Sequence, residues 1–142
     1  MSEKKNILIL CTANSARSQM AEGLLKHICN NTYNVSSAGT KASFVRPEAI
    51  EVLREIGIDI SQNRSKSVDE FSGSEIDFVL TVCNNAREAC PYFPAKTQLV
   101  HHSFDDPAAV EGIDEVRLAA YRRVRDEINE YLKNSFLKIV KE

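Results

Sequence analysis

The chain is best understood from eight consecutive residues, Cys11-Thr12-Ala13-Asn14-Ser15-Ala16-Arg17-Ser18. The apolar run Ile7-Leu8-Ile9-Leu10 precedes them, and a helical pattern begins near Arg17. A short loop before a helix start can direct its backbone N–H groups at one tetrahedral anion. We therefore expect an oxyanion-binding loop made of Thr12, Ala13, Asn14, Ser15, Ala16, Arg17 and Ser18.

Cys11 and Arg17 are the residues of this loop that carry chemistry. The planar guanidinium of Arg17 can bind two anion oxygens at once. The same donors stabilise a thiolate, so we expect Cys11 to react as a nucleophile beneath the bound anion, with Ser18 donating a hydrogen bond to its sulfur. The alternative is a buried cysteine at a strand end and a helix-capping arginine, but a strand before and a helix after favour the chemical interpretation. The loop contains no glycine and no G-x-x-x-x-G-K-[ST] motif, which excludes a nucleotide P-loop.

Composition limits the classes of protein that the chain can belong to. Its 142 residues are 43% hydrophobic and 27% charged, as in one soluble domain with a core of its own. The net charge of −2 argues against nucleic acid or an anionic membrane as a partner. No apolar run approaches the roughly 20 residues that span a bilayer, and the first residues lead straight into a predicted strand, so we expect no signal peptide. We expect a cytoplasmic monomer without cofactor or metal, whose four cysteines do not form structural disulfides. Cys29 lies on the apolar side of its predicted helix and is expected to be a core residue.

The remaining elements alternate between strand and helix. Strands are predicted at residues 6–10, 33–38, 77–82 and 97–101, of which the first and third are expected to be buried, and helices are predicted at 17–29, 47–57 and 114–133. This alternation predicts an α/β fold, a single three-layer domain whose four-stranded parallel sheet has helices on both faces. Cys11, Cys83 and Asp106 each follow a predicted strand. Because ligands bind beyond the carboxyl ends of parallel strands, one rim can hold all three.

Cys83 and Cys90 lie seven positions apart in a predicted loop after the third strand. Two nearby thiols on a flexible segment suit a relay in which one sulfur is attacked and the disulfide then moves outward. Two incidental cysteines are the simpler alternative. A zinc site with His101 or His102 is disfavoured, because the spacing lacks the tight C-x₂₋₄-C pattern of structural zinc.

Taken together, these motifs resemble the thioredoxin-coupled arsenate reductases, which share the low-molecular-weight tyrosine phosphatase fold. The resemblance covers nearly the whole chain, so residues 1–142 are expected to form one such domain. It rests on residues 11–23, Ser37-Ala38-Gly39, Gly57-Ile58-Asp59-Ile60-Ser61, Val82-Cys83, Cys90-Pro91, Phe104-Asp105-Asp106-Pro107 and residues 123–128.

The resemblance implies a mechanism. Cys11 would attack arsenate held by the loop and Arg17, while Asp106 protonates the departing oxygen. Cys83 would then attack Cys11 and release arsenite, Cys90 would attack Cys83, and thioredoxin would reduce the resulting Cys83–Cys90 disulfide.

Three positions depart from the commonest pattern of that family. Ala13 replaces a frequent glycine, and Ala16 stands where some members carry a further cysteine. Lys66 replaces an aspartate that potassium-binding members use beside residues matching Asn14, Glu22 and Ser37. We expect the Lys66 ammonium to occupy or adjoin the cation position, pair with Glu22 and support the loop. The alternative is a solvated lysine in a loop.

Two other functions use parts of the same pattern. A low-molecular-weight protein tyrosine phosphatase needs the loop and the acid but neither Cys83 nor Cys90, and its acid usually precedes tyrosines rather than Ala108-Ala109. A thiol-redox sensor without catalysis would explain the cysteines but would leave Asp106 without a role.

Overall fold

A four-stranded parallel sheet forms the centre of the computed structural model, which describes residues 4–30, 32–83 and 93–141. The strands are β1 (Asn6–Cys11), β2 (Asn34–Gly39), β3 (Phe78–Thr81) and β4 (Gln98–His101), in the order β2-β1-β3-β4. All three strand pairs are parallel, which confirms the predicted sheet.

The central strand β1 is buried on both faces, as its unbroken apolar run predicts. Ile7, Ile9 and Cys11 contribute to the larger hydrophobic cluster, whereas Leu8 and Leu10 contribute to a smaller one on the opposite face. This alternation follows from the two-residue period of a strand. It places the Cys11 side chain on the same face as the main helices.

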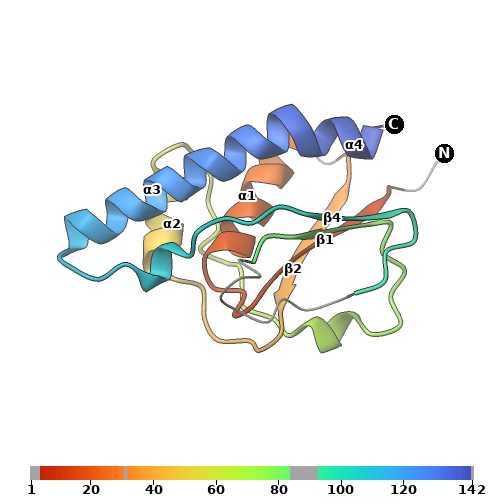
Figure 1. The fold of residues 1–142 in the computed structure, drawn as a ribbon, viewed down its shortest axis with the longest axis horizontal. Coiled ribbons are helices and arrows are strands. Elements are labelled where there is room, and N and C mark those ends of the chain that lie inside the picture. The colour runs from red at the N-terminus through yellow and green to blue at the C-terminus, as the bar shows by residue number, and fades with distance from the viewer. Residues whose placement is uncertain (1–3, 31, 84–92, 142) are drawn as a thin grey trace.

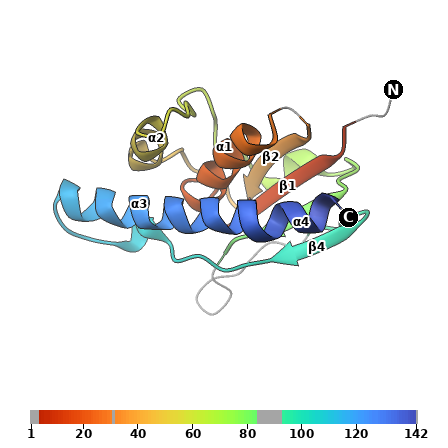
Figure 2. The same cartoon turned by 90° about the horizontal axis from the view of Figure 1, so that it is seen from above.

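Helices cover the two faces of the sheet unequally. The larger cluster includes side chains of α1 (Arg17–Cys29), α2 (Pro47–Arg54) and α3 (Asp114–Tyr131), and α3 continues through a π-helical turn η3 (Leu132–Phe136) into α4 (Leu137–Lys141). The 3₁₀ helix η1 (Val68–Phe71) packs against the smaller cluster. Figure 1 shows α3 above the sheet and η1 below it, and Figure 2 shows α1 and α2 along one side of α3.

The predicted boundaries differ from the structure by a few residues. The strand β1 extends one residue further than predicted, because Cys11 still pairs with Gly39 of β2. The helix α2 ends at Arg54, and Gly57, with φ of 82°, closes the following turn, in which the Ile58 N–H donates to the Leu53 carbonyl. In the described part of the chain, no helix has the length and apolar character needed to cross a membrane.

The fold brings the ends of three strands to one rim. Cys11 is the last residue of β1, and Cys83 lies two residues after the end of the neighbouring strand β3. Asp106 lies between β4 and the short 3₁₀ helix η2 (Pro107–Ala109). The expected convergence of these residues therefore has a structural basis in adjacent parallel strands.

Candidate active site

The carbonyl groups of the Cys11 loop are bound from outside the loop. The Thr12 carbonyl accepts from the Lys41 N–H at 3.1 Å, and the Ser15 carbonyl accepts from the Arg46 N–H at 2.9 Å. The Ala13 carbonyl accepts from the Ser65 hydroxyl at 2.9 Å. The C=O and the N–H of one trans peptide group point in opposite directions. The carbonyls of Thr12, Ala13 and Ser15 that are held outward therefore leave the N–H groups of the same peptides directed into the loop.

The start of α1 adds donors to the same loop. Ala16 precedes the helix and offers no side-chain oxygen that could cap it. The N–H groups of the first helical turn therefore stay available to an anion, which the helix dipole also attracts. Cys11 is 2% exposed and lies at the other end of this loop.

Asn14 fixes the shape of the loop. Its backbone is left-handed, with φ of 51°, a conformation that asparagine tolerates better than most residues. Its fully buried amide donates to the Ser18 hydroxyl at 2.8 Å and to the Ser37 hydroxyl at 2.9 Å. Its side-chain oxygen accepts from the Lys66 backbone N–H at 2.8 Å. Because Ser18 accepts from Asn14, its own hydroxyl hydrogen can be donated elsewhere.

Gly39 gives the loop room to approach β2. A Cβ atom at this position would lie 2.5 Å from the Thr12 carbonyl oxygen and 2.8 Å from the Asn14 nitrogen. Both atoms belong to the backbone and cannot rotate away. Glycine is therefore required here by close packing against the loop.

Arg17 connects the loop to the segment that carries the predicted acid. The side chain is almost fully buried, and its Nη1 donates to the Phe104 carbonyl at 3.3 Å. Its Nη2 lies 3.7 Å from Asp106 Oδ2. One Asp106 oxygen also accepts from the Ala108 N–H at 3.0 Å, and the side chain is 39% exposed. This arrangement orients a carboxyl group beside the anion loop and keeps it accessible to water.

Asp105 lies apart from this cluster. Its carboxylate pairs with Arg123 at 3.3 Å, and the side chain is 65% exposed. Between the two adjacent carboxylates, the contact with Arg17 therefore distinguishes Asp106.

The sulfur atoms differ in their states. Cys11 and Cys29 are free thiols, and Cys83 is in a disulfide. Cys83 is fully buried. The N–H of the preceding residue, Val82, donates to the Leu10 carbonyl at 2.9 Å. This bond places Cys83 beside the end of β1. Cys90, the other predicted relay cysteine, lies outside the described residues.

The predicted supporting residues meet behind the loop. The Ser37 hydroxyl donates to Glu22 at 2.6 Å, and the Lys66 ammonium lies 4.0 Å from the same carboxylate. Lys26 also pairs with Glu22, at 2.8 Å. Burial lowers the pKa of Lys66, and the nearby Glu22 charge partly opposes that shift. The expected Lys66–Glu22 pair is therefore present in the structure.

Three structural partners of the loop were not recognised as such from sequence: Gln19, Gly39 and Ser65. The Gln19 amide is fully buried and donates to Asn14 Oδ1 at 2.9 Å and to the Arg64 carbonyl at 3.0 Å. Gln19 lies in the helix that the sequence predicts, but its partner Arg64 is 45 positions away. The sequence therefore did not show that this side chain supports the loop. Among the described residues, no group of three or more His, Cys, Asp or Glu side chains could hold a metal ion.

Comparisons with known proteins show which family the chain resembles. Residues 6–142 match the family model described as low molecular weight phosphotyrosine protein phosphatase. A protein named arsenate reductase from Halalkalibacterium halodurans is 47% identical over 130 residues, which are 92% of this chain and 94% of the relative.

Solved structures of arsenate reductases also superimpose on this chain. The arsenate reductase of Archaeoglobus fulgidus superimposes with a TM-score of 0.76 at 28% identity, covering 96% of this chain and all of that one. A thioredoxin-dependent arsenate reductase from Corynebacterium glutamicum gives a TM-score of 0.66 at 28% identity, covering 96% of this chain and 64% of that one. The chain therefore belongs to the low molecular weight phosphotyrosine protein phosphatase family, and it is similar to proteins of that family that are named arsenate reductases.

Proposed function

We propose that this protein reduces arsenate to arsenite, with Cys11 as nucleophile and with thioredoxin as the electron donor. One observation carries the proposal: the anion loop that begins at Cys11 shares its rim with the Arg17–Asp106 pair and with Cys83. The names of the relatives support arsenate as the substrate. A phosphatase would use the loop and Asp106 but has no need of a cysteine at the end of β3.

The first half of the reaction is a substitution at arsenic. The inward N–H groups and Arg17 bind the arsenate oxygens, and the Cys11 thiolate attacks the arsenic atom from below. An S–As bond forms as an As–O bond breaks. Asp106 gives a proton to the leaving oxygen, which departs as water.

The second half is a two-electron reduction. The Cys83 thiolate attacks the Cys11 sulfur, so that an S–S bond forms and the S–As bond breaks. The electron pair of that bond stays on arsenic, which leaves as arsenite. The hydrogen bond between Val82 and Leu10 supports this step, because it holds the Cys83 backbone beside the end of β1.

The third step restores Cys11. The Cys90 thiolate attacks Cys83, which releases the Cys11 thiolate and leaves a Cys83–Cys90 disulfide. A thioredoxin dithiol supplies the two electrons that reduce it. The thioredoxin dependence of the related Corynebacterium protein supports this choice of donor.

Support of the loop is assigned to Asn14, Glu22, Ser37 and Lys66. Asn14 and Ser37 connect the loop to the Glu22 carboxylate through hydrogen bonds. The Lys66 ammonium supplies the positive charge beside Glu22, and its side chain is only 15% exposed. A lysine in this position replaces a bound cation with a covalently attached one.

The function is tested by coupling NADPH, thioredoxin reductase and thioredoxin to the protein and adding arsenate last. We expect NADPH oxidation that depends on arsenate and stops in Cys11→Ser. Cys29→Ser is the matched control, because Cys29 is also a buried free thiol but lies at the far end of α1. If the addition of arsenate does not increase NADPH oxidation, and the protein rapidly hydrolyses an aryl phosphate, the result would favour the phosphatase instead.

The relay has a separate test. After one turnover with arsenate, Cys90→Ser should hold a Cys11–Cys83 disulfide, which peptide mapping detects. Cys83→Ser should form the arsenic adduct without releasing arsenite. Mapping of a disulfide that contains Cys29 would refute the assigned order of thiols.

A further inference from the structure

The Phe104 peptide lies between two parts of the site. Its carbonyl accepts from Arg17 Nη1 at 3.3 Å, although the two residues are 87 positions apart. Its N–H donates to the Val82 carbonyl at 3.3 Å. The segment that leads to Asp106 is thereby joined to α1 on one side and to the end of β3 on the other.

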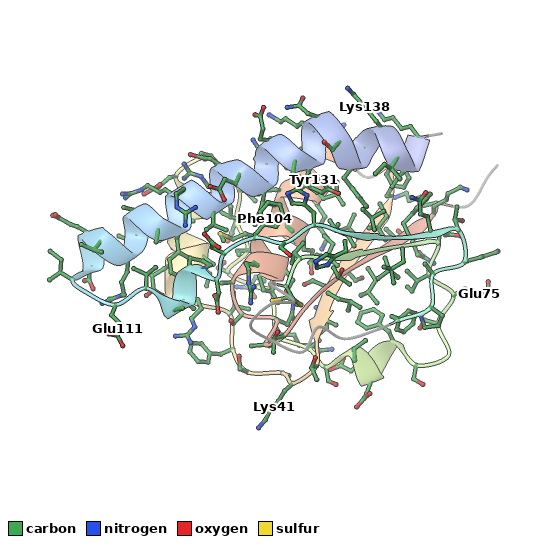
Figure 3. The ribbon with its side chains drawn as sticks, in the orientation of Figure 1. Lys41, Glu75, Phe104, Glu111, Tyr131 and Lys138 are labelled. Atoms are coloured by element: carbon green, nitrogen blue, oxygen red, sulfur yellow. The ribbon has the colours of Figure 1, made fainter. Side chains whose placement is uncertain are left out.

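An aromatic cluster fixes the Phe104 side chain. The His102 ring stacks on Tyr131 with centroids 4.1 Å apart and an interplanar angle of 22°. Phe104 meets His102 at 4.8 Å and meets the Tyr131 ring edge-on at 5.9 Å. Figure 3 shows Phe104 below α3, from which Tyr131 extends.

Tyr131 connects this cluster to the long helix. It is the last residue of α3, immediately before the π-helical turn η3. Side chains on both sides of it in sequence, Ile128 and Leu132, are fully buried, so the backbone at Tyr131 is firmly placed. Its ring, half-buried between the helix and the strand edge, therefore gives Phe104 a fixed surface to pack against.

We propose that Tyr131 is a positioning residue, which acts through Phe104 to hold the Arg17 guanidinium in its anion-binding orientation. The inference rests on the proposed function, because the anion is the substrate oxyanion. Within the described part of the chain, the ring contacts of Tyr131 are with His102 and Phe104. Its ring limits the movement of Phe104, and the Phe104 carbonyl limits the rotation of Arg17. Removal of the ring should weaken oxyanion binding without removing any group that touches the anion.

The test measures inorganic phosphate binding through protection of the Cys11 thiol against iodoacetamide in the reduced protein. Tyr131→Leu removes the aromatic ring, and Tyr131→Phe keeps it. Tyr33→Leu is the matched control, because this partly buried tyrosine lies at the opposite end of the sheet, just before β2 begins. His102→Leu removes the exposed partner of the same stack. This variant tests the inference if Tyr131→Leu does not fold.

We expect the half-protecting phosphate concentration to rise about three- to tenfold in Tyr131→Leu, the scale of one lost aromatic pair. His102→Leu should move it in the same direction, and Tyr131→Phe and Tyr33→Leu should stay near the wild type. The arsenate concentration at half-maximal arsenite release in a single turnover should rise in parallel. An unchanged affinity in Tyr131→Leu and His102→Leu, or an equal loss in Tyr33→Leu, overturns the inference. Failure of phosphate to protect even the wild type would instead refute the proposed function.

Discussion

The two flanks of the Cys11 loop are held by different interactions. On the Asn14 flank, neutral amides and hydroxyls form a continuous buried network that includes Ser18, Ser37 and Gln19. On the Arg17 flank, the guanidinium contacts the Phe104 carbonyl and the Asp106 carboxylate, and the side chains that pack around Phe104 include the aromatic rings of His102 and Tyr131. Leaving a buried hydrogen-bonding group without its partner costs about 1–3 kcal/mol, whereas one aromatic pair contributes about 0.5–1.5 kcal/mol.

This difference suits the chemistry expected of each flank. The Asn14 flank holds the shape of the loop, and no step of the proposed reaction requires the side chains of this flank to move. The Arg17 flank carries the acid and adjoins Cys83, so the geometry there changes during the proposed cycle. Substitutions on the first flank should therefore act mainly on stability, and substitutions on the second mainly on the rates of the reaction.

The largest effect is expected on the Arg17 flank. Asp106→Asn should lower the rate of single-turnover arsenite release by about 10²–10⁴-fold, because general acid catalysis contributes on that scale. Its thermal midpoint should stay close to that of the wild type, since the carboxyl group is partly exposed. Rapid quench with arsenite quantification provides the rate. Asp105→Asn is the control and should lose far less, so equal losses would remove the distinction between the two carboxylates.

On the Asn14 flank, Asn14→Ala should destabilise the fold by about 3–5 kcal/mol, because buried partners are left without hydrogen bonds. Urea denaturation measures the free energy of unfolding. Asn30→Ala is a matched control, since Asn30 also has a positive φ, of 48°, but is exposed at the end of α1. It should lose only about 1 kcal/mol, the cost of the left-handed backbone. Similar losses in the two variants would show that the network adds little.

Lys66 places a positive charge on the Asn14 flank, beside the Glu22 carboxylate. The wild type should have the same thermal midpoint in potassium, sodium and tetramethylammonium salts of equal ionic strength, because the ammonium already lies beside Glu22. Lys66→Asp should gain a potassium-specific stabilisation of about 1 kcal/mol when potassium exceeds its dissociation constant about fivefold. Specific stabilisation of the wild type by potassium would contradict the assigned role of Lys66.

The smallest effect concerns pH and the aromatic cluster behind Arg17. Phe104 and Tyr131 pack against the largely exposed ring of His102, and this partial burial lowers its pKa below the usual 6.5, with a smaller contribution from His101. The folded state then binds this proton less readily than the unfolded state, so the contribution of His102 to stability is full above pH 6.5. It is lost as the pH falls through the folded pKa.

His102→Phe keeps an aromatic ring and removes the titration. The fall in stability between pH 8 and pH 5 should therefore be smaller in this variant, by less than about 1 kcal/mol because the ring is exposed. Urea denaturation at the two pH values measures the difference. An identical pH dependence in both proteins would show that His102 does not contribute.

Much of the site could be predicted from local sequence. The apolar run before Cys11 predicts a buried strand, and the spacing from Cys11 to Arg17 predicts an anion loop at a helix start. Asp106 could be chosen over Asp105 only through the resemblance to a family, and the structure adds the contact with Arg17 as a physical reason.

Other parts depended on the tertiary structure. Nothing near Gly39 in the sequence indicates that it lies against the Thr12 and Asn14 backbone, because that contact arises only when β2 pairs with β1. Ser65 and Lys66 reach the loop across 52 positions, and Phe104 reaches Arg17 across 87.

The sequence by itself therefore determined the elements, the reactive groups and the kind of anion that they suit. Periodicity, turn residues and side-chain chemistry are local properties, and they can be read without knowing what lies nearby. The order of the strands, the contacts of Gly39 and Ser65 with the loop and the orientation of Arg17 were decided only by the tertiary structure. Those features depend on contacts between distant segments, which form only when the parallel strands bring their ends to one rim.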